Sequence, residues 1–218
     1  ASSVVGSERD FTVLQASFDW AVDTGGGVHS LGASWESRLH DGDATDQLVR
    51  GRYVLISPIL GGLVRVVATS NLGVLVNNTQ KRYFAVGGSS GADTATLADG
   101  YPRSFDSVLR GYPINRFTGY GAKVTQHIEI RTTALKLGFA RLGALVFFDA
   151  GHAAHDLSQL SLYENVGFGL RLLLPQLNTY ALRADWAFPL RTAPATDSLP
   201  EVPAGWPGRM TFGFRQVF

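Results

Sequence analysis

Cysteine is absent from this 218-residue chain, and methionine occurs only once. Without cysteine there is no disulfide framework, no thiolate metal site and no thiol nucleophile. The formal net charge is +1 at pH 7, so charge gives no general argument for nucleic acid as a partner. Apolar runs without glycine reach only about six residues, far below the roughly 20 that a membrane-spanning helix needs. The sequence therefore argues against a disulfide scaffold, a thiol enzyme and a helical membrane protein.

Motifs for catalysis and cofactor binding are missing as well. Paired carboxylates at catalytic spacing, nucleophile elbows and glycine-rich phosphate loops do not occur in recognised form. The stretch "GHAAHD" contains His152, His155 and Asp156, but their spacing is not that of a specific metal site. We expect these three residues to lie in a solvated outer loop. The sequence thus predicts no catalytic residue, no metal, no cofactor and no enzymatic activity.

Glycine, with 25 residues, and aromatic side chains, at 11%, are abundant. Apolar and polar residues alternate with a period of two over most of the chain, which is the period of a β-strand. In "GYGAKVTQHIEIR", for example, Val124 and Ile128 alternate with Lys123, His127 and Glu129. The composition and the alternation together predict an all-β protein.

About nine strands of roughly 10 to 14 residues follow from this alternation, a length that suits a tilted crossing of a bilayer. Short connections such as "PILGG", "TTALK" and "QLNT" alternate with long ones at 77–118 and 191–207. Short turns on one side and long loops on the other are typical of an outer-membrane barrel. The predicted strands are 11–22, 28–39, 48–57, 63–76, 119–131, 137–150, 165–174, 180–190 and 210–218.

A soluble antiparallel sandwich or barrel is the alternative, because its strands also have one apolar and one wet face. A soluble fold does not require aromatic residues near the strand ends, whereas a membrane barrel places them at both lipid–water interfaces. The chain has Tyr120, Tyr180, Phe188, Phe212 and Phe218 at such positions. The pattern therefore favours an antiparallel transmembrane β-barrel, with residues 1–10 as a lead-in and 11–218 as the barrel domain.

Six motifs occur in an order that resembles the barrel domain of the BamA/TamA (bacterial surface antigen) superfamily of outer-membrane proteins. The resemblance covers most of the chain from about residue 10 onward and is densest after residue 109. The motifs are "RYFAVGG" at 82–88, "LRGYP" at 109–113, "IEIR" at 128–131, "ALVFFDAGHA" at 144–153, "VGFGLRLLLPQLNTYALRADWAFPL" at 166–190 and "FGFRQVF" at 212–218.

The resemblance implies that the long loop 77–118 folds back into the barrel. Its triplet would consist of Arg110, Gly111 and Tyr112, preceded by Leu109. The arginine would meet the acidic side chains of Glu129 and Asp149 on the lumen wall. The alternation supports the pairing, because both acids fall on the polar faces of their strands. A buried guanidinium also needs carboxylate partners, whose geometry matches its fork of donors.

The resemblance further implies a location in the bacterial outer membrane and a part in outer-membrane protein assembly or polypeptide translocation. A passive pore, or a structural barrel that anchors a larger envelope complex, is the alternative. The expected partners are outer-membrane lipid and possible client outer-membrane proteins or another envelope subunit. In the family the first and last strands join loosely, so the final strand, with Phe212, Phe214 and Phe218, would be one side of that seam.

Two expectations concern the barrel as a whole. An odd number of strands is the wrong parity for a complete bacterial barrel, so these residues are expected to be the C-terminal part of a barrel of roughly sixteen strands, or to close against another chain. The alternative is that the count of nine misses one strand or includes one too many. The second expectation concerns the two faces. Lipid should meet Val66, Val124, Phe148, Leu182 and Phe212, and the lumen should receive Arg65, Lys123, Glu129, Arg183 and Arg215.

Overall fold

The computed structural model describes residues 12–40, 43–77, 83–88, 108–174 and 180–216. Within these residues the chain is all-β, as predicted, and consists of a ten-stranded antiparallel sheet and a separate two-stranded sheet. None of the helices in this part of the chain is long and apolar enough to span a membrane. The lead-in at 1–10 and most of the segment between 77 and 108 lie outside the described residues.

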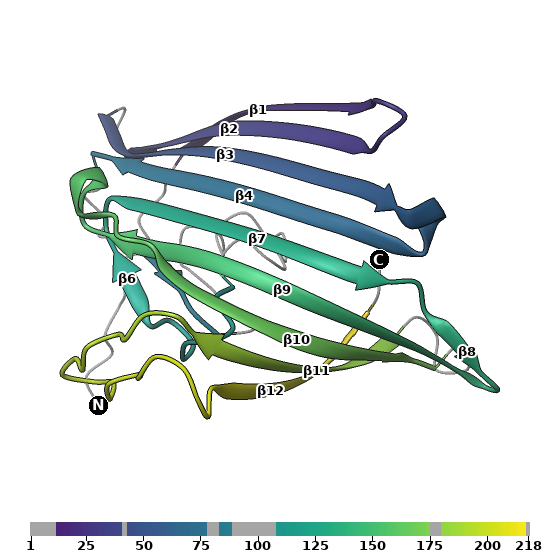
Figure 1. The fold of residues 1–218 in the computed structure, drawn as a ribbon. Helices are drawn as coiled ribbons and strands as arrows, with labels where there is room; N and C mark the ends of the chain where they lie inside the picture. Colours follow the sequence, from purple (N-terminus) through teal and green to yellow (C-terminus); the bar gives the residue numbers. More distant parts are fainter. Residues whose placement is uncertain (1–11, 41–42, 78–82, 89–107, 175–179, 217–218) are drawn as a thin grey trace, which may run out of the picture.

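Nine strands follow one another along the large sheet in the order β1-β2-β3-β4-β7-β9-β10-β11-β12, and β8 pairs with β9 beside this path (Figure 1). All nine predicted strands are confirmed, with ends that differ by a few residues. The strands are β1 Thr12–Asp23, β2 Val28–His40, β3 Asp43–Ile59, β4 Val64–Val76, β5 Phe84–Val86, β6 Phe117–Gly119, β7 Ala122–Thr132, β8 Leu135–Leu137, β9 Ala140–Ala154, β10 Tyr163–Leu173, β11 Tyr180–Pro189 and β12 Arg209–Gln216.

The predicted strand at 137–150 is shifted in the structure. Its first residue belongs instead to β8, and Gly138, with φ of +58°, forms the turn that leads into β9. The end of β9 extends to Ala154, beyond the predicted end at residue 150. The predicted strand at 119–131 likewise divides into β6 and β7. The alternation of apolar and polar residues and the positions of glycines predict where a strand lies. The residues at which the strand begins and ends also depend on the neighbouring strands with which it pairs.

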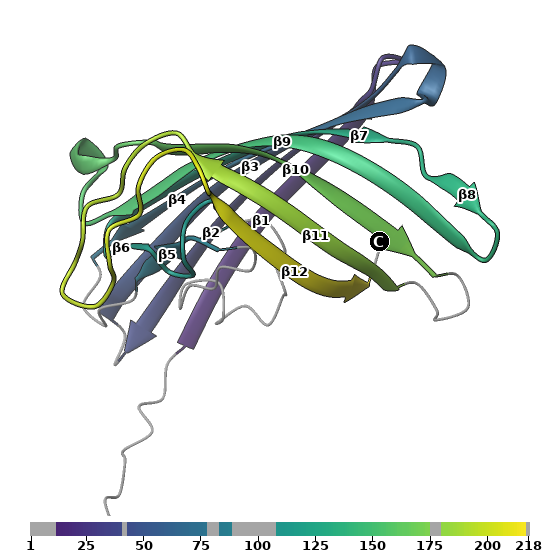
Figure 2. The same ribbon diagram turned by 60° about the horizontal axis from the view of Figure 1, so that its bottom comes forward.

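The large sheet curves into an arch, and the two-stranded sheet of β5 and β6 lies on its concave side (Figure 2). The arch is not closed. Among the described residues, β1 pairs only with β2 and β12 pairs only with β11, so each has one edge without a partner strand. Nine strands in this arrangement therefore form an open sheet and not a complete barrel.

The two faces of the sheet differ in burial. On β7, Lys123, Thr125, His127 and Glu129 face the concave side and are buried. On β9, by contrast, Val146 belongs to the convex face and is 52% exposed.

The strand register agrees with the predicted facing of the side chains. The convex face carries Val66, Val124, Phe148, Leu182 and Phe212, and the concave face carries Arg65, Lys123, Glu129 and Arg183. The side chain of Arg215 lies outside the described part.

Part of the concave face is covered by the described residues between β4 and β7, at 83–88 and 108–121, which we call the inward segment. Phe84 and Val86 of β5 are fully buried there, in one apolar cluster with Leu109 and Tyr112. Leu48 and Leu75 contribute to the cluster from the sheet itself. The segment that carries the "RGY" triplet is thus held against the inner wall of the arch by a small core of its own.

Candidate functional site: an arginine clamp on the concave wall

The triplet lies in a tight turn that backbone hydrogen bonds hold to the end of β5. Gly88 N donates to Leu109 O at 3.1 Å and to Tyr112 O at 3.0 Å, and Leu109 N donates back to Gly88 O at 2.9 Å. The "GG" pair and the triplet are therefore joined directly, even though residues 89–108 separate them in the sequence. The turn projects Arg110 toward β7, β9 and β11.

Arg110 is almost completely buried and contacts carboxylates from three strands. Its Nε and Nη2 donate to the two oxygens of Asp149 at 2.8 and 2.6 Å, which is the bidentate arrangement that suits a guanidinium best. Its Nη1 lies 2.7 Å from Glu129 Oε1 and 4.0 Å from Asp185 Oδ2. The guanidinium carbon also sits 3.5 Å from the centre of the Phe147 ring. We call this group of residues the arginine clamp.

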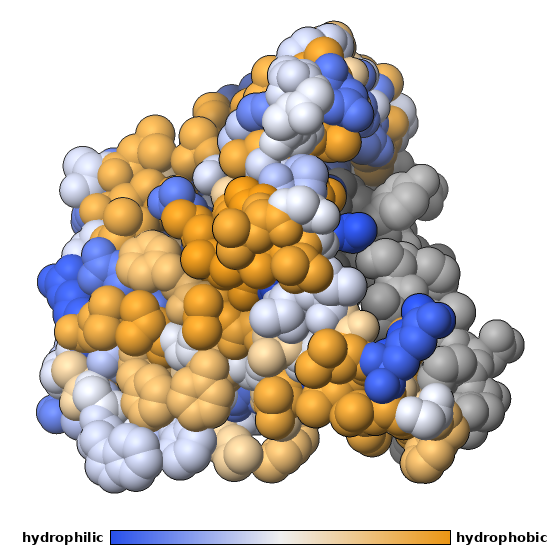
Figure 3. All heavy atoms as spheres, turned by 45° about the vertical axis from the view of Figure 1, so that its right-hand side comes forward, coloured by the Kyte–Doolittle hydropathy of each residue, from blue (hydrophilic) through white to orange (hydrophobic). Residues whose placement is uncertain are grey.

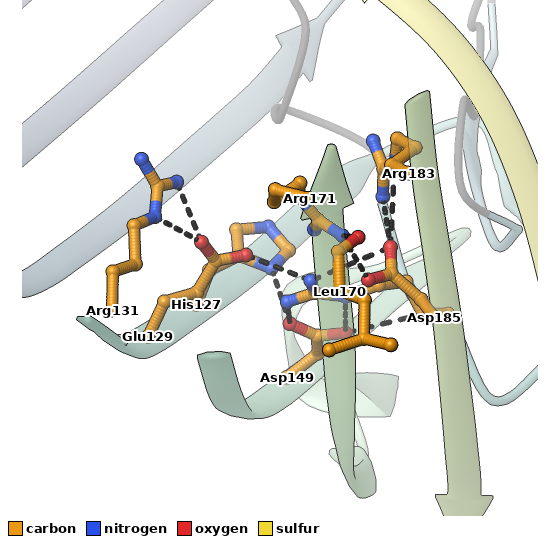
Figure 4. A network of polar contacts seen from close by, with 9 residues as sticks. His127, Glu129, Arg131, Asp149, Leu170, Arg171, Arg183 and Asp185 are labelled. Carbon is orange, nitrogen blue, oxygen red and sulfur yellow. Dashed lines mark hydrogen bonds and ion pairs between the residues drawn. The ribbon is translucent and has the colours of Figure 1, made fainter. Parts of the chain in front are cut away.

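Further cations surround the three acids (Figure 4). Arg131 pairs with Glu129 at 2.5 Å, and Arg171 and Arg183 pair with the two oxygens of Asp185 at 2.6 and 2.5 Å. Together with the clamp, these neighbours bring four guanidinium groups close to three carboxylates, so that each acid has at least one close cation. His127 completes the group, with its Nδ1 at 3.2 Å from Asp149 Oδ1.

The electrostatics of the clamp keep Arg110 charged. Burial by itself lowers the pKa of the guanidinium, because a charge is less stable away from water. The hydrogen bonds with Asp149 and the charges of Asp149, Glu129 and Asp185 outweigh burial, so the pKa of Arg110 lies above its ordinary value. A buried charge of this kind persists only with all of its partners in place. The clamp is thus an ion-pair network that attaches the turn to the wall of the sheet.

Glycines in β10 make the room that the clamp requires. The sequence "NVGFGLRLL" places Gly167 and Gly169 on the concave face. A Cβ at Gly167 would lie 2.2 Å from Trp186 O and 2.4 Å from the Phe147 ring, and one at Gly169 would lie 2.1 Å from Asp185 Oδ1. Any larger residue would displace the ring under the guanidinium or the carboxylate beside it.

Tyr112 ties the turn to the ends of β10 and β11. Its hydroxyl donates to Arg191 O at 2.7 Å, with Glu164 O at 3.2 Å. Burial raises the pKa of Tyr112 to about 12, so the hydroxyl stays protonated and remains a donor at neutral pH. The middle residue of the triplet has no side chain for a related reason, because a Cβ at Gly111 would lie 2.7 Å from Asn165 Cβ. All three residues of the triplet thus have a distinct contact with the wall.

Arg116, just after the triplet, links the same segment to the loop between β11 and β12. Its Nη2 donates to the carbonyl oxygens of Ala193 and Pro194, and the arginine is buried. Ala193 is itself part of the apolar cluster and forms a bridge with Val202 across the loop. The start of the edge strand β12 is therefore connected to the inward segment through a short chain of contacts.

The structure brings together the residues that the sequence analysis paired. Arg110 contacts both Glu129 and Asp149, while Leu109 and Tyr112 are buried beside it. Sequence reasoning did not include Asp185 or Phe147 in the site. Asp185 falls on the polar side of its strand, and Phe147 is an aromatic residue in the polar register of β9. These strand positions of Asp185 and Phe147 can be read from the sequence, but they do not show that both residues contact Arg110.

Other predicted site residues have a different outcome. Phe212 of the seam strand is on the convex face and 74% exposed, whereas the side chain of Phe214 and all of Phe218 lie outside the described residues. The expectation of a solvated loop was wrong for His152, which lies within β9, half buried, with its ring 5.2 Å from that of Phe117. His155 stacks on Tyr120. Asp156 is exposed and accepts a hydrogen bond from Ser158 N, which lowers the pKa of Asp156.

Removing Arg110 tests the clamp directly. Arg110→Ala leaves the buried Asp149 and Glu129 without their central cation, and is expected to lower the free energy of unfolding by roughly 3 to 5 kcal/mol. Arg110→Lys should recover only part of the loss, because an ammonium group cannot form the bidentate pair. Arg131→Ala is the matched control: Arg131 also pairs with Glu129 but is partly exposed, so the cost should stay within about 1 kcal/mol. Urea denaturation in lipid vesicles measures all three, and equal losses for the two alanine variants contradict the assignment.

A substitution in β10 tests the space around the clamp. Gly167→Ala forces Phe147 and the β10–β11 pairing apart and should destabilise the protein by roughly 1 to 3 kcal/mol. Gly143→Ala on the concave face of β9 is the control, because the nearest atom to its new Cβ is 3.9 Å away. The same denaturation experiment compares them. If the Gly167→Ala variant is as stable as the Gly143→Ala variant, the position of the Phe147 ring does not depend on a glycine at residue 167.

A scan against protein-family models found none that matches the chain, and a search of curated proteins found no match.

Proposed function

We propose that this chain forms part of an outer-membrane β-barrel whose convex face contacts lipid. Support comes from the inverted burial of the sheet: polar side chains such as Lys123 and Glu129 are buried on the concave face, while large apolar ones cover the convex face. A soluble sandwich would have packed that apolar face against a second layer. Eight of the nine main strands have 10 to 17 residues, which is long enough for a tilted crossing of the bilayer, and β12 has 8 residues.

We further propose that the barrel acts in the manner of the BamA/TamA superfamily, in outer-membrane protein assembly or polypeptide translocation. The observation that carries this proposal is the arginine clamp. A long loop between β4 and β7 turns inward and is attached to the wall by Arg110, as the family resemblance implies. A barrel that serves only as an anchor has no evident need for a buried ion-pair network whose central charge comes from a loop.

A passive pore is the second candidate, and the polar concave face favours it. Lys123, Glu129 and Arg131 line the wall, as pore-facing residues do in water-filled barrels. The inward segment covers part of this wall, however, because Phe84 and Val86 are fully buried against it. The two functions differ in what that segment does: it would be an obstruction in a pore and a working part in an assembly protein.

The facing of the sheet can be tested with two valine substitutions. Val146→Arg places a charge in the middle of the convex face and should cost roughly 2 to 4 kcal/mol in a bilayer. Val54→Arg makes the same exchange in the middle of β3 on the concave face, where water is available, and should cost much less. Folding yield and urea denaturation in lipid vesicles report the difference. Equal behaviour of the two variants would remove the argument for a lipid-facing convex side.

The proposed activity is tested by folding a small unfolded outer-membrane barrel protein into vesicles that contain this chain. Faster folding than in empty vesicles is expected, with the advantage lost in Arg110→Ala and retained in Arg131→Ala. Folding is followed by the resistance of the client to dissociation in detergent without heating. If the client folds no faster than in empty vesicles, and the chain gives steady ion conductance across planar bilayers, the pore is supported and the assembly function is contradicted.

A further inference from the structure

The turn between β7 and β9 carries a short hairpin that takes no part in the arginine clamp. In this hairpin β8 pairs with the start of β9, so that Leu135 lies opposite Leu142, Lys136 opposite Arg141, and Leu137 opposite Ala140. Because successive side chains of a strand point to opposite sides, the leucines share one side and the two cations share the other. The hairpin is therefore amphipathic, with Phe139 at its tip.

Its apolar residues are exposed to an unusual degree. Leu135 is 68%, Leu137 52% and Phe139 71% exposed. The hairpin extends beyond the body of the sheet at the end where the short turns lie (Figure 1). Lys136 and Arg141 are exposed too, and neither forms an ion pair with another described residue.

The neighbouring turn between β3 and β4 adds to the same patch. Leu60 and Leu63 are 73% and 68% exposed. The two turns are joined by Thr133, whose N–H donates to Leu63 O at 2.8 Å and whose hydroxyl donates to Gly62 O at 2.8 Å. Figure 3 brings this end of the molecule forward and shows apolar side chains gathered on it between polar areas. Five large apolar side chains thus project from two adjacent turns.

The position of the patch indicates what covers it. Ala140 and Leu142 belong to the convex face of β9, so the leucine side of the hairpin continues the apolar face of the sheet without a break. The cationic side continues the concave face. Apolar side chains on one side with lysine and arginine on the other are typical of elements that lie in a membrane interface and attract anionic lipids.

We propose that residues 133–142 form an interfacial anchor that binds the anionic head groups of phospholipids in the leaflet nearest the short turns. Leu135, Leu137 and Phe139 enter the acyl region, and Lys136 and Arg141 reach the phosphates. The inference rests on the proposed location in a membrane, but goes beyond it by assigning a lipid class to one hairpin. A second copy of the chain or another protein could cover the same patch instead of lipid, and the experiment below distinguishes lipid from protein.

The absence of cysteine allows a clean test with single fluorescent labels in vesicles. Labels are attached at Leu137→Cys, on the apolar side, and Lys136→Cys, on the cationic side. A third label at Val146→Cys, on the convex face of the same β9, reports whether the sheet is in the bilayer. Nitroxide-bearing lipids should quench the labels at 146 and 137 strongly. The label at 136 should be quenched by iodide in the water.

The charge requirement is tested with the label at 137 in vesicles of zwitterionic lipid, with and without anionic phosphatidylglycerol. Anionic lipid should strengthen attachment of the hairpin by roughly fivefold for each cation. The double variant Lys136→Gln/Arg141→Gln should abolish this gain. Arg52→Gln, which removes an exposed charge from the concave face of β3, should leave the gain unchanged.

The outcomes distinguish this inference from the proposed function. If nitroxide lipids do not quench the label at 146, the membrane location and the anchor are both overturned. If nitroxide lipids quench the label at 146 but not the label at 137, the anchor alone is overturned. The anchor is also overturned if neither iodide nor nitroxide lipid quenches the labels at 136 and 137, because a protein then covers the patch. A gain in anionic vesicles that survives the double glutamine variant also overturns the assigned role of the cations.

Discussion

The ion pairs of Arg110 are the constraint on which the other features of the concave side depend. One guanidinium meets Asp149, Glu129 and Asp185, which come from three different strands. Such a charge cannot be left unpaired in a buried site, so the loop, the acids and the strand register must all be compatible. The glycines of β10 and the Phe147 ring are consequences of the same requirement, because the guanidinium needs both room and a surface to lie on.

The two faces of the sheet follow different rules because they have different surroundings. On the concave side, polar groups such as Lys123 and Thr125 are buried by the inward segment and by one another. On the convex side, large apolar groups such as Val146 are exposed, and no second layer covers them within the part of the chain that the structure describes. Lipid would resolve both observations, since it satisfies an apolar face and leaves polar groups to be paired inside. The amphipathic hairpin at the end of β9 continues this division past the edge of the sheet.

The inward segment is also connected to the last hairpin of the sheet. Tyr112 and Arg116 donate to main-chain oxygens between residues 191 and 194, in the loop that leads to β12. β12 follows this loop and has a free edge within the described sheet. The turn that holds Arg110 is therefore attached to the loop that leads to an edge strand.

The β class, the nine main strands and the division of their residues into two faces could all be predicted from the sequence, because alternation with a period of two is a local property of the chain. The sequence also indicated the pairing of Arg110 with Glu129 and Asp149, through the polar register of two strands and the likeness of the triplet to a known loop. The tertiary structure alone decided that Asp185 and Phe147 join the site and that His152 lies within a strand. Those contacts depend on how far β9 extends and on which strands lie side by side around the loop, and neither is encoded in any short stretch of residues. The same holds for the open edges of β1 and β12, because closure of a sheet is a property of all its strands together.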